Sequence, residues 1–298
     1  MHGFHRHFPV IAAAAALVAG GLAAPAQAAD WSDTSMGIRG GSKYAEPFNG
    51  KDITKSIVDL NHVSGYKYGS NFFNADLLLS DKNDPSALGS TNGAQEVYVV
   101  YRHTLDLEKV TGTAFKFGPV RGLGVTAGFD FNVKTDVGYN SKKRMLVAGP
   151  TLKMDVPGFL DVSLLALWES NQPSGKAFPA PTFAPVDYSK GRYSYDTHAM
   201  LTAAWGIPLG KDTGFSFEGF ANFIASKGKD EFGAATAPET NIDAQVMYDL
   251  AALTGSKGKF KIGLEYQYWK NKFGNDASGA AGKGATARTP MLRAEYHF

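Results

Sequence analysis

From Asp30 onward, the sequence consists of repeated segments of about 10 to 14 residues in which apolar and polar residues alternate. Clusters of Gly, Asn, Asp, Ser, Lys and Pro separate these segments. A period of two places successive side chains on opposite faces of a strand, so the pattern predicts many half-buried strands joined by turns. We expect twelve strands, at residues 34–43, 54–64, 71–79, 95–105, 121–134, 143–155, 159–169, 192–206, 214–226, 240–251, 258–270 and 287–298.

The segment 214–226 shows the alternation most clearly. One face carries Phe215, Phe217, Gly219, Ala221 and Phe223, and the other carries Ser216, Glu218, Phe220, Asn222 and Ile224. An apolar face opposite a polar face suits a barrel whose outside meets lipid and whose inside is polar. The strands of a soluble β-sandwich also alternate between apolar and polar residues, but its short and long connections have no reason to follow one another in a regular order.

The connections do sort by length from the fourth expected strand onward. Those at 156–158, 209–213 and 252–257 are compact, and those at 171–191, 227–239 and 271–286 are longer. Short periplasmic turns and long outer loops are typical of up-and-down outer-membrane barrels. The long connection at 106–120 lies on the short-turn side and departs from this rule. The pattern predicts an all-β fold, a transmembrane antiparallel up-and-down barrel of twelve strands.

The last residues support a closed barrel. Leu292, Ala294, Tyr296 and Phe298 share one face of a strand that ends with the chain. An exposed edge strand of this kind would invite aggregation, whereas closure against the first strand removes the edge. With an even number of strands, both ends of the barrel are expected in the periplasm of a Gram-negative cell.

The first 28 residues have the pattern of a cleaved signal peptide. A polar start with Arg6 precedes an apolar run from Val10 to Ala24, which the small residues around Ala28 follow. The run has about 15 residues, whereas roughly 20 are needed for a helix to span a bilayer. We expect cleavage after Ala28, which leaves residues 29–298 as the barrel; an uncleaved anchor is the alternative.

Charge and cysteine content limit the partners. Lys and Arg total 30 against 28 Asp and Glu, so the chain is nearly neutral, and it contains no cysteine. Nucleic-acid binding demands a basic face, which this balance does not indicate. The fold therefore depends on no disulfide, and we expect no nucleic-acid partner and no cofactor.

Several segments resemble the Tsx family of nucleoside-specific outer-membrane channels. They are Phe117-Gly118-Pro119 with the strand after it, the Pro157-Gly158 turn and the strand that runs to Asn171, the piece EVYVVYRHTLDLEKVT from Glu96, and the closing AEYHF. The resemblance implies a narrow monomeric barrel in the outer membrane that passes nucleosides by diffusion, and a surface that phage or colicins can use as a receptor. The Ala- and Gly-rich outer loops depart from the family, so individual nucleoside contacts are not carried over.

The polar phase of the strands predicts which side chains line the interior. These are Glu96, Tyr98, Arg102, Asp130, Lys153, Asp155, Asp161, Glu169, Asp196, Glu218, Phe220, Asp243, Lys261, Glu265, Trp269, Arg293 and Glu295. One sign of charge would select ions, whereas mixed signs suit a neutral polar solute. The alternative interpretation is that the charges only pair across strands and fill a narrow barrel.

Aromatic residues in the polar phase are the more informative candidates, because a nucleoside needs flat faces for its base and hydrogen bonds for its sugar. They are Phe72, Tyr98, Phe220 and Trp269, unless a bulge turns them to lipid. The candidate substrate site is Phe72, Tyr98, Arg102, Asp130, Glu218, Phe220, Glu265, Trp269 and Arg293. Outward rings such as Trp168, Tyr193, Trp205, Tyr266 and Tyr268 are expected to lie at the membrane interfaces.

Catalysis and metal binding find little support. A lipase-type barrel needs Ser and His on the lipid-facing side, but His198 falls in the inward phase, and His62 and His103 have no nucleophile motif nearby. No metal-ligand spacing such as HExxH occurs. Two alternatives to a nucleoside channel remain, a channel for another solute such as a small hydrophobic compound, and a surface barrel that transports nothing.

Overall fold

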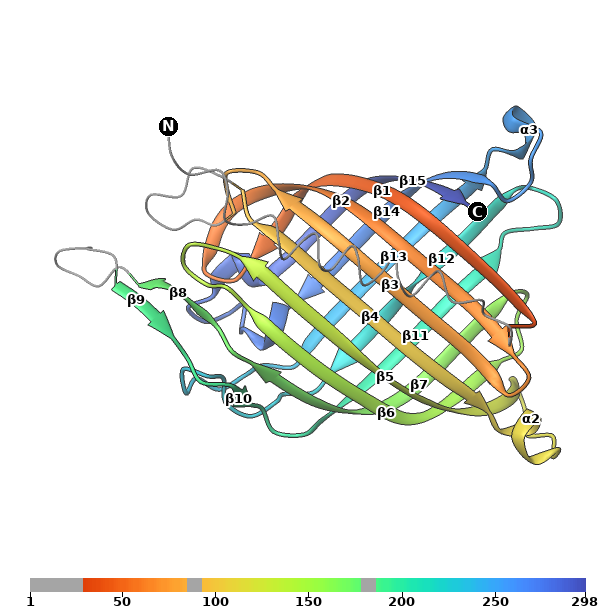
Figure 1. The fold of residues 1–298 in the computed structure, drawn as a ribbon, viewed down its shortest axis with the longest axis horizontal. Coiled ribbons are helices and arrows are strands. Elements are labelled where there is room, and N and C mark those ends of the chain that lie inside the picture. Colours follow the sequence, from red (N-terminus) through yellow and green to blue (C-terminus); the bar gives the residue numbers. More distant parts are fainter. Residues whose placement is uncertain (1–28, 85–92, 178–185) are drawn as a thin grey trace.

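The computed structural model describes residues 29–84, 93–177 and 186–298, and the expected signal peptide at 1–28 lies outside them. Within these residues, twelve long antiparallel strands form one barrel (Figure 1). The strands are β1 (Trp31–Glu46), β2 (Asn49–Tyr66), β3 (Gly69–Ser80), β4 (Gln95–Asp106), β5 (Val120–Thr135), β6 (Lys142–Met154), β7 (Phe159–Asn171), β11 (His198–Pro208), β12 (Phe215–Ile224), β13 (Glu239–Asp249), β14 (Phe260–Lys270) and β15 (Thr286–His297).

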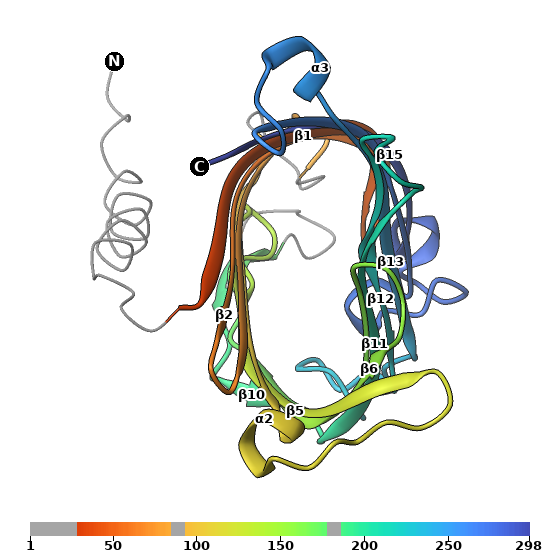
Figure 2. The same cartoon turned by 90° about the vertical axis from the view of Figure 1, so that its right-hand side faces the viewer.

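The last strand closes the barrel against the first. β15 pairs with β1 from Ser35 opposite His297 to Gly41 opposite Met291, and every other long strand pairs with its neighbours in the chain. The strands form an elongated ring (Figure 2). A Cβ at Gly41 would lie 2.2 Å from the carbonyl oxygen of Pro290, so the closure needs glycine there. The predicted fold class, a closed twelve-stranded barrel, is confirmed.

The two ends of the barrel differ. The turn end holds both ends of the barrel chain and compact connections, with α2 (Leu107–Thr111) and α3 (Ala251–Thr254) among them. The long connection at 106–120 also lies at this end. Its first residues form α2, and the Asp106 side chain caps the helix by accepting hydrogen bonds from the N–H groups of Glu108 and Lys109.

The loop end holds the longer connections. They include the hairpin of β8 (Ser174–Ala177) and β9 (Val186–Ser189), and the 3₁₀ turns η1 (Lys272–Gly274) and η2 (Gly282–Ala285). The expected strand 192–206 is wrong as one element. It divides into β10 (Tyr193–Ser194) and β11, because the Asp196 N–H leaves the barrel ladder and donates to the Lys227 carbonyl in the loop that follows β12.

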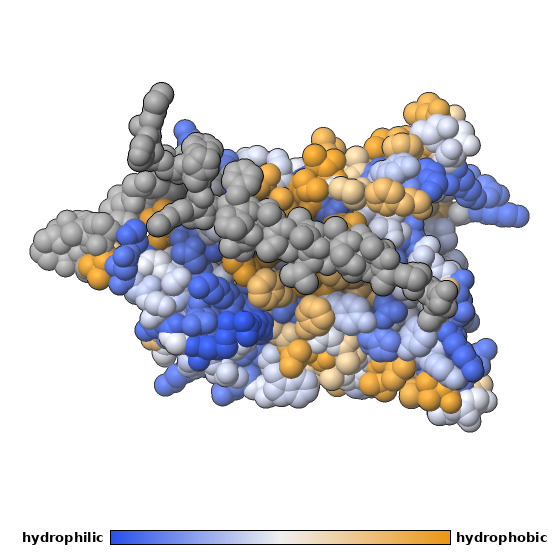
Figure 3. All heavy atoms as spheres, in the orientation of Figure 1, coloured by the Kyte–Doolittle hydropathy of each residue, from blue (hydrophilic) through white to orange (hydrophobic). Residues whose placement is uncertain are grey.

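Burial in the barrel is the reverse of that in a soluble protein. On the outside, Leu264 and Leu292 are 67% and 70% exposed, whereas inside, Lys55 and Asp59 are each 1% exposed. Figure 3 shows apolar residues gathered over the middle of the visible wall and polar residues toward the loop end. A closed sheet satisfies every backbone group internally, and an apolar outer wall removes the cost of contact with hydrocarbon. The barrel is therefore a transmembrane one.

Among residues 29–84, 93–177 and 186–298, no helix is both long enough and apolar enough to cross a bilayer.

Aromatic rings gather on the outside near both ends. At the turn end, Phe215 packs on Tyr248, and Phe260 packs on Tyr296, with ring centroids 4.7 and 4.8 Å apart. Toward the loop end, Trp168 and Tyr266 are both 48% exposed. Such pairs of girdles mark the two interfaces of a membrane.

Candidate functional site in the barrel interior

The inner wall carries a charged network along the closure seam, which we define as β14, β15, β1, β2 and β3. The Arg39 guanidinium on β1 reaches Asp59 at 3.3 Å, Asp76 at 2.6 Å and Glu265 at 3.5 Å. The Arg293 guanidinium on β15 reaches Asp59 at 3.4 Å and Glu265 at 3.1 Å. Two cationic side chains therefore share the same carboxylates across several strands.

This seam network has a surplus of negative charge. Besides Asp59, Asp76 and Glu265, the Glu295 carboxylate accepts a hydrogen bond from Arg293, so that four carboxylates face two guanidinium groups. The predicted site residues Glu265 and Arg293 are brought together here. Because a ring of one sign raises the local concentration of the opposite charge, this part of the interior favours cationic or hydrogen-bond-donating groups.

A second group joins three of the predicted site residues on β4 and β5. The Tyr98 hydroxyl donates to Asp130 at 3.1 Å, and the Arg102 guanidinium forms an ion pair with the same carboxylate. Phe72 on β3 lies directly opposite Arg102 in the register, in the same inward phase as Asp76, and is 37% exposed. This group places an aromatic face beside a paired charge.

A ladder of hydroxyl groups crosses the inner wall from β4 to β7. Thr104 lies 2.8 Å from Thr126, Thr126 lies 2.6 Å from Thr151, and Thr151 lies 2.8 Å from Ser163, measured between hydroxyl oxygens. Each hydroxyl can donate and accept, so the ladder offers hydrogen bonds without charge. These four residues were not among those predicted from the sequence, although all of them lie in the inward phase of their strands.

Two further predicted residues lie on β12. Glu218 accepts a hydrogen bond from Ser216 at 2.6 Å and lies 3.6 Å from the Lys261 ammonium on β14. Phe220 lies opposite Asp243 on β13 and opposite Ala204 on β11. Phe220 therefore presents a ring between a small residue and an acidic one, in the inward phase of the barrel.

Trp269, the last predicted aromatic residue, is held at the loop end by its neighbours. Its indole N–H donates to Glu239 at 2.8 Å, and its ring packs edge-on against Phe273 with 4.9 Å between centroids. The backbone N–H of Phe273 donates to the same Glu239 carboxylate. One carboxylate thus fixes both aromatic residues at the mouth.

Residues 272 and 273 connect distant parts of the wall. The Lys272 ammonium on η1 lies 2.9 Å from Glu46 at the end of β1, and Lys143 at the start of β6 places its ammonium 3.8 Å from the centre of the Phe273 ring. β1 and β6 are not neighbours in the barrel. Lys272 and Phe273, at the start of the connection from β14 to β15, therefore reach across the inside of the mouth.

Paired charges surround this crossing segment. Lys55 and Lys134 reach Asp84 at 3.4 and 2.8 Å, and both also reach Glu46. On the other side, the Lys227 ammonium lies 2.8 Å from Glu169. Charges of both signs are nearly balanced at the mouth, which contrasts with the acidic surplus of the seam network.

A group of loop side chains lies around Glu231, above the mouth. The hydroxyls of Tyr139 and Tyr195 donate to its carboxylate, and so does the amide of Asn171 at 3.0 Å. Burial by itself raises the pKa of Glu231, but the two hydroxyl hydrogen bonds and the nearby Lys143 outweigh it, so the pKa lies below its ordinary value. Burial, together with the Glu231 charge, raises the pKa of Tyr139 and of Tyr195.

The interior also holds two apolar patches that the expectation of a polar lumen missed. One joins Tyr44, Ile53, Ile57 and Met291 on β1, β2 and β15, and the other joins Val147, Leu165, Leu167 and Met200 on β6, β7 and β11. On β7 both faces are apolar, because Leu164, Ala166 and Trp168 point outward. Leu165 and Leu167 share the inward phase of Asp161 and Glu169, but as apolar residues they were not included in the expected polar lining.

Two residues expected in the interior lie elsewhere. Asp155 follows the end of β6 in the exposed turn, where its N–H donates to the Pro119 carbonyl, and Asp196 is exposed in the break between β10 and β11. Both expectations were wrong because the strands end earlier, or begin later, than the alternation suggested. The other charged residues expected inside lie in the inward phase of their strands.

Several residues that were not predicted from the sequence also lie in the interior. Arg39, Asp59 and Asp76 share the inward phase of their strands, so the alternation could have revealed them. Lys272 and Phe273 lie in a connection, where no period exists. Contact with Glu46 and Lys143 depends on how that connection folds back into the barrel, which no local pattern encodes.

These features define the class of the protein: a transmembrane β-barrel with a polar, partly aromatic interior and a mouth crossed by a loop. No family model matches the chain, and no curated protein matches it. The resemblance to nucleoside-specific channels therefore stays a prediction.

Solved barrels have a similar overall arrangement. The translocator domain of autotransporter NalP from Neisseria meningitidis shares 10% identity, covers 97% of this chain and 95% of its own, and has a TM-score of 0.48. An outer membrane channel from Pseudomonas putida F1 shares 13% identity, covers 92% and 99%, and has a TM-score of 0.45. The KdgM porin shares 8% identity, covers 89% and 99%, and has a TM-score of 0.39. Because the TM-scores are below 0.5 and the identities are 13% or lower, these similarities carry no argument about function.

Proposed function

We propose that this chain is an outer-membrane channel through which small polar solutes, nucleosides in particular, diffuse down their concentration gradient without catalysis. One observation carries the proposal: the inner wall sets the Phe72 ring beside the Arg102–Asp130 ion pair. A nucleoside presents a flat base and a sugar rich in hydroxyls, and it needs aromatic faces and hydrogen bonds of both kinds.

In this proposal, the two ends of the barrel have different surroundings. The turn end, with its short connections and both chain ends, lies in the periplasm, and the loop end faces outside. A solute enters past Lys272 and Phe273, meets Phe220 and the seam network, and leaves past Phe72. Each contact is weak, because a tight site would stop the flux.

The test is single-channel current across a planar bilayer that contains the folded protein. Adenosine, thymidine and ribose are titrated separately. We expect saturable block by both nucleosides and little block by ribose, and Phe72→Ala and Phe220→Ala should each weaken the block. Leu253→Ala, on the exposed helix α3, is the matched control and should leave the block unchanged. A pore that is indifferent to nucleosides would reject this substrate.

The two inward apolar patches favour a second candidate, a channel for small hydrophobic or aromatic compounds. Ile57 and Leu167, one from each patch, are 3% and 0% exposed, so apolar side chains fill part of the interior on two groups of strands. Block by toluene or benzoate, with none by adenosine, would select this candidate. A barrel that conducts nothing would indicate a surface protein instead.

A further inference from the structure

The strand pairing of the closure seam stops short of the loop end. β1 pairs with β15 only as far as Gly41, and beyond it Lys43 adopts a positive φ of 67° in an irregular stretch of β1. β15, by contrast, pairs with β14 along its whole length from Thr286. One edge of β15 therefore has no strand partner between Thr286 and Pro290.

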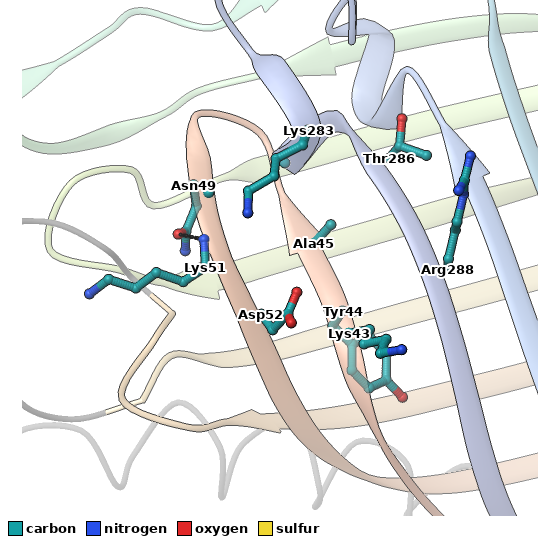
Figure 4. A pocket seen from close by; sticks show the side chains of 11 residues that line it. Lys43, Tyr44, Ala45, Asn49, Lys51, Asp52, Lys283, Thr286 and Arg288 are labelled. Atoms are coloured by element: carbon teal, nitrogen blue, oxygen red, sulfur yellow. Dashed lines mark hydrogen bonds between the residues drawn. The ribbon is translucent and has the colours of Figure 1, made fainter.

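A pocket of about 210 Å³ occupies this place (Figure 4). It lies between the end of β1, the start of β2, η2 and the start of β15, and four cationic residues, Lys43, Lys51, Lys283 and Arg288, line it together with one carboxylate, Asp52. η2 is pressed against the turn between β1 and β2, because a Cβ at Gly284 would lie 2.2 Å from the Glu46 carbonyl oxygen. The packing of η2 therefore positions Lys283 over the pocket.

These four cations differ from the lysines just inside the barrel. Within the described residues, none of their side chains forms an ion pair or a hydrogen bond with another residue, whereas Lys55 and Lys272 are both paired with Glu46. The pocket thus gathers positive charge that the surrounding protein leaves without a counter-charge. Lys and Arg so arranged bind phosphate groups through charge-assisted hydrogen bonds.

An apolar hollow lies on the same seam, farther down the wall. Ile38, Gly40, Leu292 and Ala294 line it together with Ser56 and parts of Arg39 and Arg293, and its volume is about 250 Å³. Leu292 follows Arg288 by four residues, which is about 14 Å along a strand, so the hollow lies within the apolar wall while the cationic pocket lies toward its rim. The side chains of Tyr266 and Tyr268 lie on the adjoining strand β14, opposite Pro290 and Arg288.

We propose that this seam binds one phosphorylated lipid of the outer leaflet, with its phosphate headgroup in the cationic pocket and an acyl chain in the apolar hollow. The order along the wall, from charge through tyrosines to apolar surface, matches the order from headgroup to hydrocarbon in a bilayer. The choice of leaflet rests on the orientation given under the proposed function. The site itself does not depend on whether the barrel conducts.

The test measures lipid binding by the full chain, folded in a zwitterionic detergent, by native mass spectrometry. The probes are diphosphorylated lipid A, the same lipid A without phosphates, and inorganic phosphate. We expect the double variant Lys283→Gln/Arg288→Gln to weaken binding of the phosphorylated lipid by about ten-fold, since two charge-assisted contacts are lost. Its binding of the lipid without phosphates should not change.

Matched variants complete the test. Lys142→Gln/Arg144→Gln removes two exposed cations at the start of β6, at the same end of the barrel but outside the pocket, and should change binding by less than about two-fold. Ala294→Trp fills the hollow and should weaken both lipids. If the double variant fails to fold, Lys43→Gln/Lys51→Gln probes the same pocket. Equal losses in the β6 control, or inorganic phosphate binding as tightly as the lipid, would overturn the proposal.

Discussion

Lys143 and Phe273 meet inside the mouth, with the ammonium 3.8 Å from the centre of the ring, although Lys143 lies near the start of β6 and Phe273 lies in the connection after β14. The same ring packs against Trp269, and its backbone N–H donates to Glu239. Phe273 is therefore the residue through which the crossing segment is attached to the wall on that side. Contacts of a cation with an aromatic face contribute about 0.5 to 2 kcal/mol, so this attachment is modest in strength.

Phe273→Ala should widen the mouth. Removal of the ring releases the crossing segment from Lys143 and Trp269, so we expect a higher single-channel conductance and more frequent current fluctuations. Measurement in planar bilayers at fixed salt and voltage checks this. Phe48→Ala, at the exposed turn between β1 and β2, is the control, and its conductance should match that of the parent. Equal conductance in all three proteins would show that the segment does not limit flow.

Arg39→Gln should raise cation selectivity and lower stability. The substitution removes the positive charge that Arg39 places beside Asp59, Asp76 and Glu265, so the interior becomes more negative. Breaking a buried ion pair on one side costs about 3 to 5 kcal/mol in the free energy of unfolding. The reversal potential in a KCl gradient measures the first effect, and guanidinium titration measures the second.

Arg121→Gln is the control for Arg39→Gln. The Arg121 guanidinium donates to the Gly158 carbonyl at the turn end, and its replacement removes the same charge outside the seam network. We expect a small change in both measurements. A shift toward anion selectivity in Arg39→Gln, or an unchanged reversal potential, would contradict the acidic surplus assigned to the network.

Glu231→Gln should loosen the loops in a pH-dependent way. The folded-state pKa of Glu231 lies below its ordinary value of 4.5, so the ionised carboxylate stabilises the folded loops. That contribution is fully present above pH 4.5 and is lost as the pH falls through the folded-state pKa. Hydrogen exchange around Tyr139 and Tyr195 should therefore be faster in Glu231→Gln than in the parent at pH 6.

The two proteins should exchange alike once the pH is low enough to protonate Glu231 in the parent. Asp212→Asn, in the exposed turn between β11 and β12, should not change exchange in these loops at either pH. A difference between Glu231→Gln and the parent that persists unchanged at low pH would mean that the carboxylate charge is not its cause.

Period-two alternation was enough to predict most of the barrel. The expected strand 121–134 is β5, from Val120 to Thr135, and the expected strand 287–298 is β15, because each has one apolar and one polar face. The break before β11 was not foreseeable, since Tyr195 continues the strand-like pattern. The Tyr195 N–H donates to the Glu169 carbonyl, whereas the N–H of the next residue, Asp196, donates to the Lys227 carbonyl in another loop.

The interior was predictable only where strands show their phase. Glu265 and Arg293 were expected inside and meet there, because both lie on clearly alternating strands. Leu165 and Leu167 share the inward phase of Asp161 and Glu169 on β7, but they were passed over because only polar and aromatic residues were taken as lining the interior. The partners of Lys272 and Phe273 depend on the fold of a connection, and such contacts join residues far apart in the chain.

Leu264→Arg should destabilise the barrel in a membrane. Leu264 lies midway along β14 on the outer wall, between Val246 and Leu292 on the neighbouring strands, and is 67% exposed. An arginine on the lipid face costs about 2 to 4 kcal/mol at the bilayer midplane and about 0 to 1 kcal/mol near the interfaces. Reversible unfolding by guanidinium in phosphatidylcholine vesicles measures the free energy of unfolding.

Leu253→Arg is the control for this last substitution, because Leu253 is 81% exposed on α3, beyond the turn end of the barrel. The same change there meets water rather than hydrocarbon, so we expect little loss of stability. The comparison isolates the effect of the surrounding bilayer from that of the arginine itself. If Leu264→Arg cost no more than Leu253→Arg, the wall formed by β13, β14 and β15 would not face acyl chains.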